Sequence, residues 1–349
     1  MLSKQITRCI KTSINIPVCD VESVNSISGI RATIFGGTGF LGHAIAAKLG
    51  SISSDMIFPH CHYYLFDDHV KRLRLMGNLG MTYVLNHTNF EDPNILRRSM
   101  EHSNVAINCI GPRKKVIHYD KFKEVNIDIP KRLAKQAKKA GVKRFIHFSS
   151  LGVDENSPSL DLRTKFVGEQ AVLSEFPDAT ILRLGTSIGL NDHFQRIFRH
   201  NANNFVKFLP VFSSLEAKRR PIIDIDVALA VLNAIKLPET AGKTYQVYGP
   251  HEYTLKELYE VMMNILNRPM TFPKINRNFA LGLSKIISGR YLSHDMLIKE
   301  EIDLIPENRE DLYHIEDLMV RPASIIPTLK DIMGKYGDPL SYVKDDANL

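Results

Sequence analysis

Residues 36–42, near the N-terminus, have the composition and spacing of a loop that binds a dinucleotide. They fit Gly-x-Gly-x-x-Gly from Gly37, and a second spacing, Gly-x-x-Gly-x-x-Gly, begins at Gly36. Glycines at these places allow a tight turn, a close approach of the backbone to a pyrophosphate and close packing of the next helix, whose N-terminus attracts phosphate. The run predicts nucleotide binding; the alternative is a glycine-rich turn without a ligand.

The flanking residues supply the strand and the helix between which such a loop must lie. Residues 32–35 are apolar or β-branched, which predicts a buried strand. Residues 43–49 predict a helix that ends at Gly50. Strand, glycine turn and helix therefore follow one another in the order of a dinucleotide-binding unit.

Strand and helix patterns alternate through the next part of the chain. Further strands are expected at residues 61–66, 82–85, 105–110, 144–148 and 179–184. Helices are expected at residues 95–102, 129–140 and 227–235, the last capped by Asp226. This alternation predicts an α/β fold, a Rossmann-type doubly wound parallel sheet with right-handed crossovers. Helical spacing from Thr254 onward predicts a smaller, mostly helical C-terminal region.

Several segments, in the same order along the chain, are similar to one family. They are residues 74–80 (RLMGNLG), 101–108 (EHSNVAIN), 141–150 (GVKRFIHFSS), 162–169 (LRTKFVGE), 176–180 (FPDAT) and 241–245 (AGKTY). Together they resemble the NADPH-binding accessory subunits of mitochondrial respiratory complex I, which are atypical short-chain dehydrogenases. The resemblance covers residues 36 to 268 and is faint beyond them. It implies a Rossmann-type fold, bound NADPH and a place in complex I.

The residues that would catalyse a reaction in this superfamily are altered here. Short-chain dehydrogenases place a Tyr four residues before a Lys, on the helix after the fifth strand, and the Tyr transfers a proton. Lys165 matches that Lys, but Asp161 stands at the Tyr position, and a carboxyl is ionised near neutral pH. Ser149 is where the catalytic Ser would lie, although a hydroxyl there can also cap a turn. We expect no independent catalysis and no metal site.

The cofactor preference depends on the end of the second strand. An acidic side chain there binds the 2′-hydroxyl of NADH, whereas Arg favours the 2′-phosphate of NADPH. Asp67 and Asp68 favour NADH, while Arg72 would reach a phosphate if the loop folds back. The resemblance implies NADPH, and NADH stays open as the alternative. The predicted cofactor-binding residues are Gly36, Gly37, Thr38, Gly39, Phe40, Leu41, Gly42, Asp67, Arg72, Gly111 and Lys165.

The N-terminal residues and the overall charge bear on location and partners. Residues 1–19 contain Lys and Arg but no acid, with apolar residues on one helical face, which predicts a mitochondrial presequence. The formal net charge is +7, and the basic clusters at residues 113–115 and 218–220 would suit cardiolipin or an acidic subunit surface. Neither is interleaved with aromatic residues, so nucleic acid is not an expected partner.

These observations predict three parts and one function. We expect a presequence and linker (1–26), a nucleotide-binding domain (27–184 plus about 220–249) and a smaller docking region (185–219 plus 250–349). The resemblance implies a non-catalytic accessory subunit of mitochondrial NADH:ubiquinone oxidoreductase, peripheral on the matrix side of the inner membrane, with other complex I subunits as partners. The alternative is an active NAD(P)-dependent reductase or epimerase of the matrix.

Overall fold

The computed structural model describes residues 27–60, 68–77, 81–86, 88–112, 119–189, 192, 215–266 and 294–334 of the 349-residue chain. The expected presequence, Asp67 and the basic residues 113–115 lie outside the described residues.

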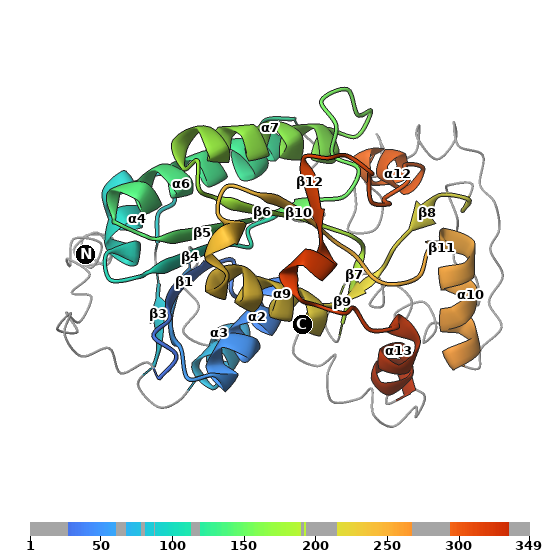
Figure 1. Cartoon of the computed structure of the whole chain (residues 1–349), viewed down its shortest axis with the longest axis horizontal. Coiled ribbons are helices and arrows are strands. Elements are labelled where there is room, and N and C mark those ends of the chain that lie inside the picture. The colour runs from blue at the N-terminus through green and yellow to red at the C-terminus, as the bar shows by residue number, and fades with distance from the viewer. Residues whose placement is uncertain are drawn as a thin grey trace, which may run out of the picture.

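An eight-stranded parallel sheet organises the described residues (Figure 1). Its strand order is β12-β10-β6-β5-β4-β1-β2-β3. The bounds are β1 Arg31–Phe35, β2 Asp55–Pro59, β3 Thr82–Leu85, β4 Val105–Asn108, β5 Arg144–Ser150, β6 Thr180–Leu184, β10 Thr244–Val247 and β12 Leu312–His314. The chain builds outward from β1 to β3 and then returns to place β4 on the opposite side of β1. The carboxyl ends of β1 and β4 therefore flank a switch point, where open α/β sheets bind ligands.

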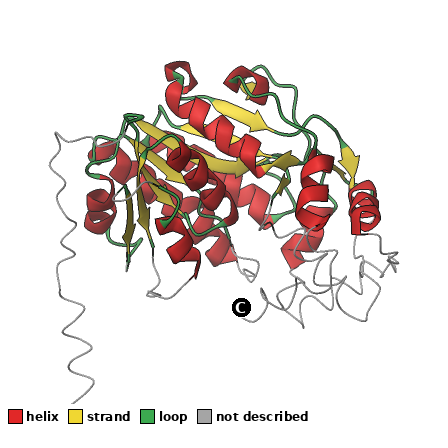
Figure 2. Cartoon of the chain, turned by 90° about the horizontal axis from the view of Figure 1, so that it is seen from below, coloured by secondary structure: helices red, strands yellow, loops and turns green. Residues whose placement is uncertain are grey.

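Helices cover both faces of this sheet (Figures 1 and 2). One face carries α2 (Phe40–Ser51), α3 (Asp68–Arg74) and α9 (Asp224–Lys236), and the other carries α4 (Pro93–Met100), α6 (Ile129–Lys139) and α7 (Leu160–Glu175). Successive residues of a strand point to opposite faces. Ile34 accordingly packs in the core with Leu49, and Phe35 in the core with Leu133. The predicted doubly wound parallel sheet is confirmed.

The smaller region lies beyond one end of the sheet (Figure 1). It contains two short paired sheets, β7 (Ser187–Ile188) with β9 (Ile222–Ile223) and β8 (Lys218–Arg219) with β11 (Tyr253–Thr254). Its helices are α10 (Leu255–Leu266), α12 (His294–Glu300) and α13 (Ile325–Gly334). Leu258, Met262 and Leu329 form part of its own apolar core. β12 comes from the stretch expected to form this region, yet it pairs with β10 in the main sheet.

Three local predictions were wrong. The second strand is Asp55–Pro59, not residues 61–66, which lie outside the described residues; it begins with a buried acid that pairs with Arg31 at 3.0 Å. Gly50 lies inside α2 and does not end it. A glycine is found there because it packs on the carbonyl of Met76, which a Cβ would approach to 1.8 Å. Asp226 is inside α9, and its carboxylate accepts from the backbone N–H of Ala323 at 2.8 Å instead of capping the helix.

Candidate nucleotide site

The glycine loop between β1 and α2 has no room for a side chain at Gly36, Gly37 or Gly42. Gly36 has a φ of +79°, and a Cβ there would lie 2.9 Å from the carbonyl carbon and oxygen of Cys109, directly after β4. A Cβ on Gly42 would lie 2.3 Å from the carbonyl oxygen of Gly36, and one on Gly37 would lie 2.4 Å from the Phe58 ring. The three glycines thus permit the turn, the contact with β4 and the close packing of α2 on its own loop.

The first turn of α2 has the features of an anion-binding helix N-terminus. The N–H of Gly39 donates to the carbonyl of Gly36 at 2.9 Å, and the N–H of His43 donates to the carbonyl of Gly39 at 3.0 Å. Gly39 is the N-cap, and among the described residues no side chain caps the helix. The first backbone N–H groups and the positive end of the helix dipole are therefore open to phosphate oxygens.

The remaining residues of the loop hold it in place. Thr38 is half-buried beside the cap. Leu41 packs against the core that α2 forms with the sheet. Phe40 lies against the segment after β6, since a Cβ on Gly189 would lie 2.7 Å from its ring. The loop is thus supported both from the sheet and from the segment that leads into the smaller region.

A hydrogen-bonded pair braces the loop after β4. The amide of Asn108 at the end of β4 lies 3.0 Å from Nδ1 of His147 on β5, and its Oδ1 accepts from the N–H of Ile110 at 3.1 Å. That second bond directs the Asn108 Nδ2 donor to an imidazole acceptor, so His147 is neutral with its proton on Nε2. Within the described part of the chain, no heavy atom lies within 4 Å of a Cβ built on Gly111. Gly111 borders open space.

At the position of the missing Tyr, Asp161 forms a buried ion-pair cluster. Its Oδ2 accepts from Nζ of Lys165 at 3.0 Å and from Nζ of Lys299 at 2.6 Å. Asp161 is 6% exposed. The sequence analysis found Asp161 and Lys165 one turn apart on α7, but it missed Lys299, which comes from α12 and lies 138 residues away along the chain.

The electrostatics of this cluster exclude proton donation by Asp161. Burial alone would raise the pKa of its carboxyl, but the charges and hydrogen bonds of Lys165 and Lys299 outweigh burial and hold that pKa well below its usual range. Burial lowers the pKa of Lys165, an effect that Asp161 opposes and Lys299 reinforces. A carboxylate that stays ionised at all physiological pH values cannot replace the phenol as an acid.

Ser149 is a polar group with an unmet requirement. It lies near the end of β5 and is 6% exposed, and its Oγ has no hydrogen-bond partner among the residues that the structure describes. A buried hydroxyl without a partner is unfavourable, so a ligand or a water at this point would satisfy it. Together with the uncapped helix and the space beside Gly111, this fits a bound dinucleotide.

A second residue that the sequence analysis missed is Asn126. It lies in η1 (Glu124–Asp128), a single π-helical turn between α5 (Tyr119–Lys123) and α6. Its Nδ2 donates to Oδ1 of Asp161 at 3.2 Å, so Asn126 binds the oxygen that the lysines leave. A Cβ on Gly168 of α7 would lie 2.0 Å from the Asn126 carbonyl, which explains why a glycine stands there. π-helical turns often occur at functional sites.

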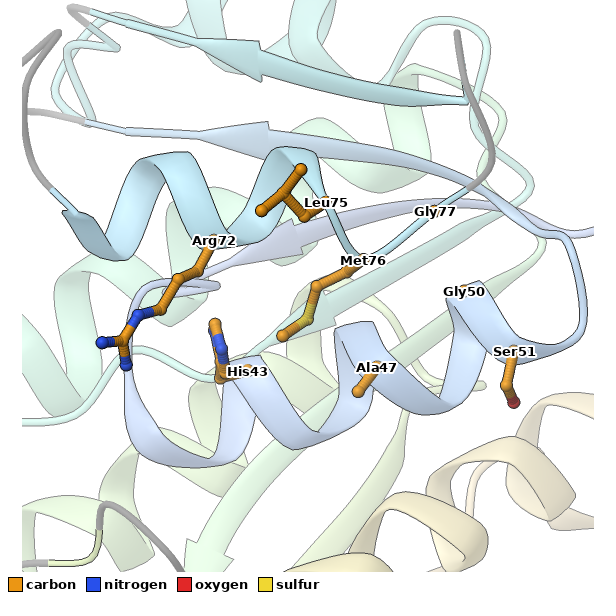
Figure 3. Close-up of a pocket in the computed structure, with 8 residues that line it drawn as sticks. All are labelled: His43, Ala47, Gly50, Ser51, Arg72, Leu75, Met76 and Gly77. Atoms are coloured by element: carbon orange, nitrogen blue, oxygen red, sulfur yellow. The ribbon is translucent and has the colours of Figure 1, made fainter.

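The groups that would select between NADH and NADPH are partly described. β2 ends at Pro59, and Asp68 begins α3. Arg72 on α3 and His43 on α2 lie at the same end of a pocket of about 620 Å³ between the two helices (Figure 3). Since His43 directly follows Gly42, this end borders the first turn of α2. The structure thus places Arg72 near the N-terminus of α2.

The basic cluster at residues 218–220 has a buried residue at its centre. Arg219 is 4% exposed and donates to the carbonyls of Lys299 and Glu300 at 3.1 and 3.0 Å. Lys218 pairs with Glu252 at 3.0 Å, and the Arg220 guanidinium lies 4.5 Å from the centre of the Tyr248 ring. The expected contact of this cluster with lipid or an acidic partner is therefore wrong for Arg219, whose charge serves the fold.

The described residues contain neither a membrane-spanning helix nor a metal-binding cluster. None of the helices there is long and apolar enough to cross a membrane. The same residues contain no group of three or more His, Cys, Asp or Glu side chains placed to hold a metal ion.

Comparisons with known proteins give a consistent family. Residues 30–303 match the model of the NmrA-like family. Mitochondrial NADH dehydrogenase (ubiquinone) 1 alpha subcomplex subunit 9 of Rattus norvegicus is 35% identical over 310 residues, which cover 86% of this chain and 79% of that protein. The mitochondrial NADH-ubiquinone oxidoreductase 40 kDa subunit of Neurospora crassa is 30% identical over 306 residues, covering 86% and 78%.

A solved structure supports the fold. The dTDP-glucose 4,6-dehydratase of Streptomyces venezuelae, in a double mutant crystallised with NAD, superposes with a TM-score of 0.67 at 18% identity, covering 90% of this chain and 98% of that one. At this level of identity, the likeness shows a shared architecture.

Proposed function

Since this chain belongs to the NmrA-like family and to the family of the alpha subcomplex subunit 9 of mitochondrial NADH dehydrogenase (ubiquinone), we propose that it is an accessory subunit of respiratory complex I. In this role it binds NADP(H) tightly, without turning it over, and supports the assembly or stability of the complex.

Binding of a dinucleotide is supported by the geometry around the switch point. Residues 36–42 would hold the pyrophosphate through backbone N–H groups, because three of the loop's glycines leave no room for a Cβ and α2 has a glycine as its N-cap. Gly111 would border the nucleotide from the β4 side, and Lys165 would donate to ribose hydroxyls. A bound dinucleotide supplies hydride-transfer chemistry in active members of such folds; here the chain's own residues bind and orient it.

A preference for NADP(H) over NAD(H) is supported by charge. Arg72 lies at the end of the pocket that borders the first turn of α2 and is exposed, so its guanidinium is available to a 2′-phosphate. Asp67 would oppose this preference. Comparing the affinities of the chain for NADPH and NADH, with Arg72→Ala as the variant, tests which of the two prevails.

The observation that carries the non-catalytic assignment is the state of Asp161. Asp161 stands at the position of the proton donor. Its ion pairs with Lys165 and Lys299 keep the carboxyl ionised, and an ionised carboxyl has no proton to donate. Lys165 is bound to this carboxylate in place of a phenol. Retention of nucleotide is useful without turnover, because a ligand in thousandfold excess over its Kd stabilises the folded state by about 4 kcal/mol.

Location and partners follow from the same family. We place the chain peripherally on the matrix side of the mitochondrial inner membrane, in contact with other complex I subunits. On the described surface, the exposed lysines of α6 are basic groups available to cardiolipin or to an acidic neighbour. They are Lys131, Lys135, Lys138 and Lys139.

The test is to solubilise mitochondrial membranes gently, separate native complexes by size, locate the chain by mass spectrometry and extract its nucleotide. Comigration with complex I and near-stoichiometric NADP(H) is expected. Migration as a small soluble species with exchangeable nucleotide would contradict the proposal and favour a reductase or epimerase, which turnover on a panel of carbonyl and nucleotide-sugar substrates would then identify.

A further inference from the structure

Helix α12 docks on the first turn of α7 through two residues one turn apart. The carboxylate of Asp295 accepts from the hydroxyl of Ser159 at 3.1 Å and from the N–H of Asp161 at 3.2 Å, and it also accepts from the N–H of Leu160. Four residues later, Nζ of Lys299 donates to the carboxylate of Asp161 at 2.6 Å. One face of α12 therefore supplies both an anion for the N-terminus of α7 and a cation for its buried acid.

These contacts are needed for α12 to exist as a helix. It has seven residues, too few for a stable helix in water, so its conformation depends on what it packs against. Leu297 is 5% exposed. At the C-terminal end, Arg219 donates to the carbonyls of Lys299 and Glu300. Docking and helix formation are thus one event, and losing the α7 contacts removes the main polar reason for both.

Lys299 of the docked helix binds the same carboxylate as Lys165, the residue expected to hold the nucleotide ribose. Lys165 and Lys299 both donate to Oδ2 of Asp161. An ammonium has three donors, so Lys165 can bind Asp161 and a ribose hydroxyl together. If α12 leaves, Asp161 keeps a single lysine, and Leu160 and Asp161 lose the acceptor for their N–H groups. The first turn of α7 is then less well held, and the carboxylate, no longer shared with Lys299, binds the Lys165 ammonium more strongly and away from the ribose.

We propose that docking of α12 and binding of the dinucleotide are coupled through Asp161, so that each favours the other. The inference rests on the proposed nucleotide site and adds a mode of regulation to it. Because such coupling is reciprocal, bound nucleotide stabilises α12, and α12 raises the affinity for nucleotide by the same factor. The conformation of α12 thereby depends on whether the Rossmann domain has bound nucleotide.

The experiment measures the Kd for NADPH of the unaltered full chain and of four variants. Lys299→Met and Asp295→Asn remove the two α12 contacts separately, Lys299→Arg keeps the charge, and Lys256→Met is the matched control, since Lys256 on α10 is 61% exposed and pairs weakly with Glu260. We expect at least a fivefold loss of affinity in the first two variants, typical of such coupling, partial recovery in Lys299→Arg and no change in the control.

A second measurement uses the unaltered chain and holds even if a variant fails to fold. Hydrogen exchange of the peptide covering α12 is compared with and without saturating NADPH, and slower exchange is expected with nucleotide. Wild-type affinity in both Lys299→Met and Asp295→Asn, or exchange of α12 that ignores NADPH, overturns the coupling and leaves the nucleotide site intact. Absence of any dinucleotide binding by the unaltered chain overturns the proposed function and the coupling together.

Discussion

A buried imidazole beside the proposed nucleotide site makes the free energy of unfolding depend on pH in a defined window. Burial, aided by the nearby charge of Lys165, lowers the pKa of His147 from 6.5 to about 4. The hydrogen bond with Asn108 also favours the neutral imidazole, because a proton on Nδ1 would place a donor against the amide donor. The folded chain therefore keeps His147 neutral between these two pH values, whereas the unfolded chain takes up a proton.

The perturbation is His147→Gln, which keeps an acceptor for the Asn108 amide and removes the titrating group. Since the unfolded state binds more protons between about pH 6.5 and pH 4, the contribution of His147 is fully present above this window and is lost as the pH falls through it. A fall in pKa from 6.5 to about 4 corresponds to about 3 kcal/mol, at about 1.4 kcal/mol per pH unit.

The assay is urea unfolding followed by circular dichroism, at intervals from pH 7.5 to pH 4. The free energy of unfolding of the unaltered chain should fall by about 3 kcal/mol more than that of His147→Gln over this range. His251→Gln, which removes an exposed imidazole from a distant loop, controls for general effects of the substitution. Parallel pH curves for the unaltered chain and His147→Gln would refute the buried neutral imidazole.

Three further substitutions test the site. Gly42→Ala places a methyl 2.3 Å from a backbone oxygen that cannot move away, so thermal melting should show a lower Tm and no stabilisation by NADPH. Gly39→Ala meets the Gly36 oxygen at 3.1 Å, a tighter than usual contact that a shift of a few tenths of an ångström would relieve, so it should lower the free energy of unfolding less than Gly42→Ala does, while calorimetry shows weaker NADPH binding. Asp161→Tyr removes the counter-charge of two buried ammoniums and should cost about 3–5 kcal/mol in urea unfolding without any turnover of carbonyl substrates; a gain of turnover would mean that only the proton donor was missing.

The parts of the fold that local sequence encodes were predictable. The third strand was expected at residues 82–85 and is found at Thr82–Leu85, and the glycine loop was identified from its spacing alone. The second strand was missed because it begins with Asp55 and ends with Pro59, two residue types that are uncommon in strands. The buried acid is acceptable there because it pairs with Arg31. β12, a three-residue edge strand, and β10, which lies between it and β6, were missed.

The candidate site was predictable on α7 and unpredictable beyond it. Asp161 and Lys165 are one helical turn apart, so their pairing follows from periodicity. Asp295 and Lys299 approach α7 from more than 130 residues away, and nothing in a single sequence links them to Asp161. Asn126 lies in a π-helical turn, whose extra residue leaves no trace in the hydrophobic pattern. Long-range contacts of this kind require the fold.

The non-catalytic role that we propose and the docking of α12 both involve the carboxylate at position 161. A phenol there would serve proton transfer, but it is neutral and would leave Lys299 half-buried beside Lys165 without an anion between them. A carboxylate binds both lysines, Lys165 of α7 and Lys299 of α12, while the backbone N–H of residue 161 donates to Asp295 whatever the side chain is. The same carboxylate cannot be protonated while both lysines are present, so it cannot act as an acid. The side chain that holds α12 on α7 is therefore unsuited to the proton transfer that a phenol at this position would serve.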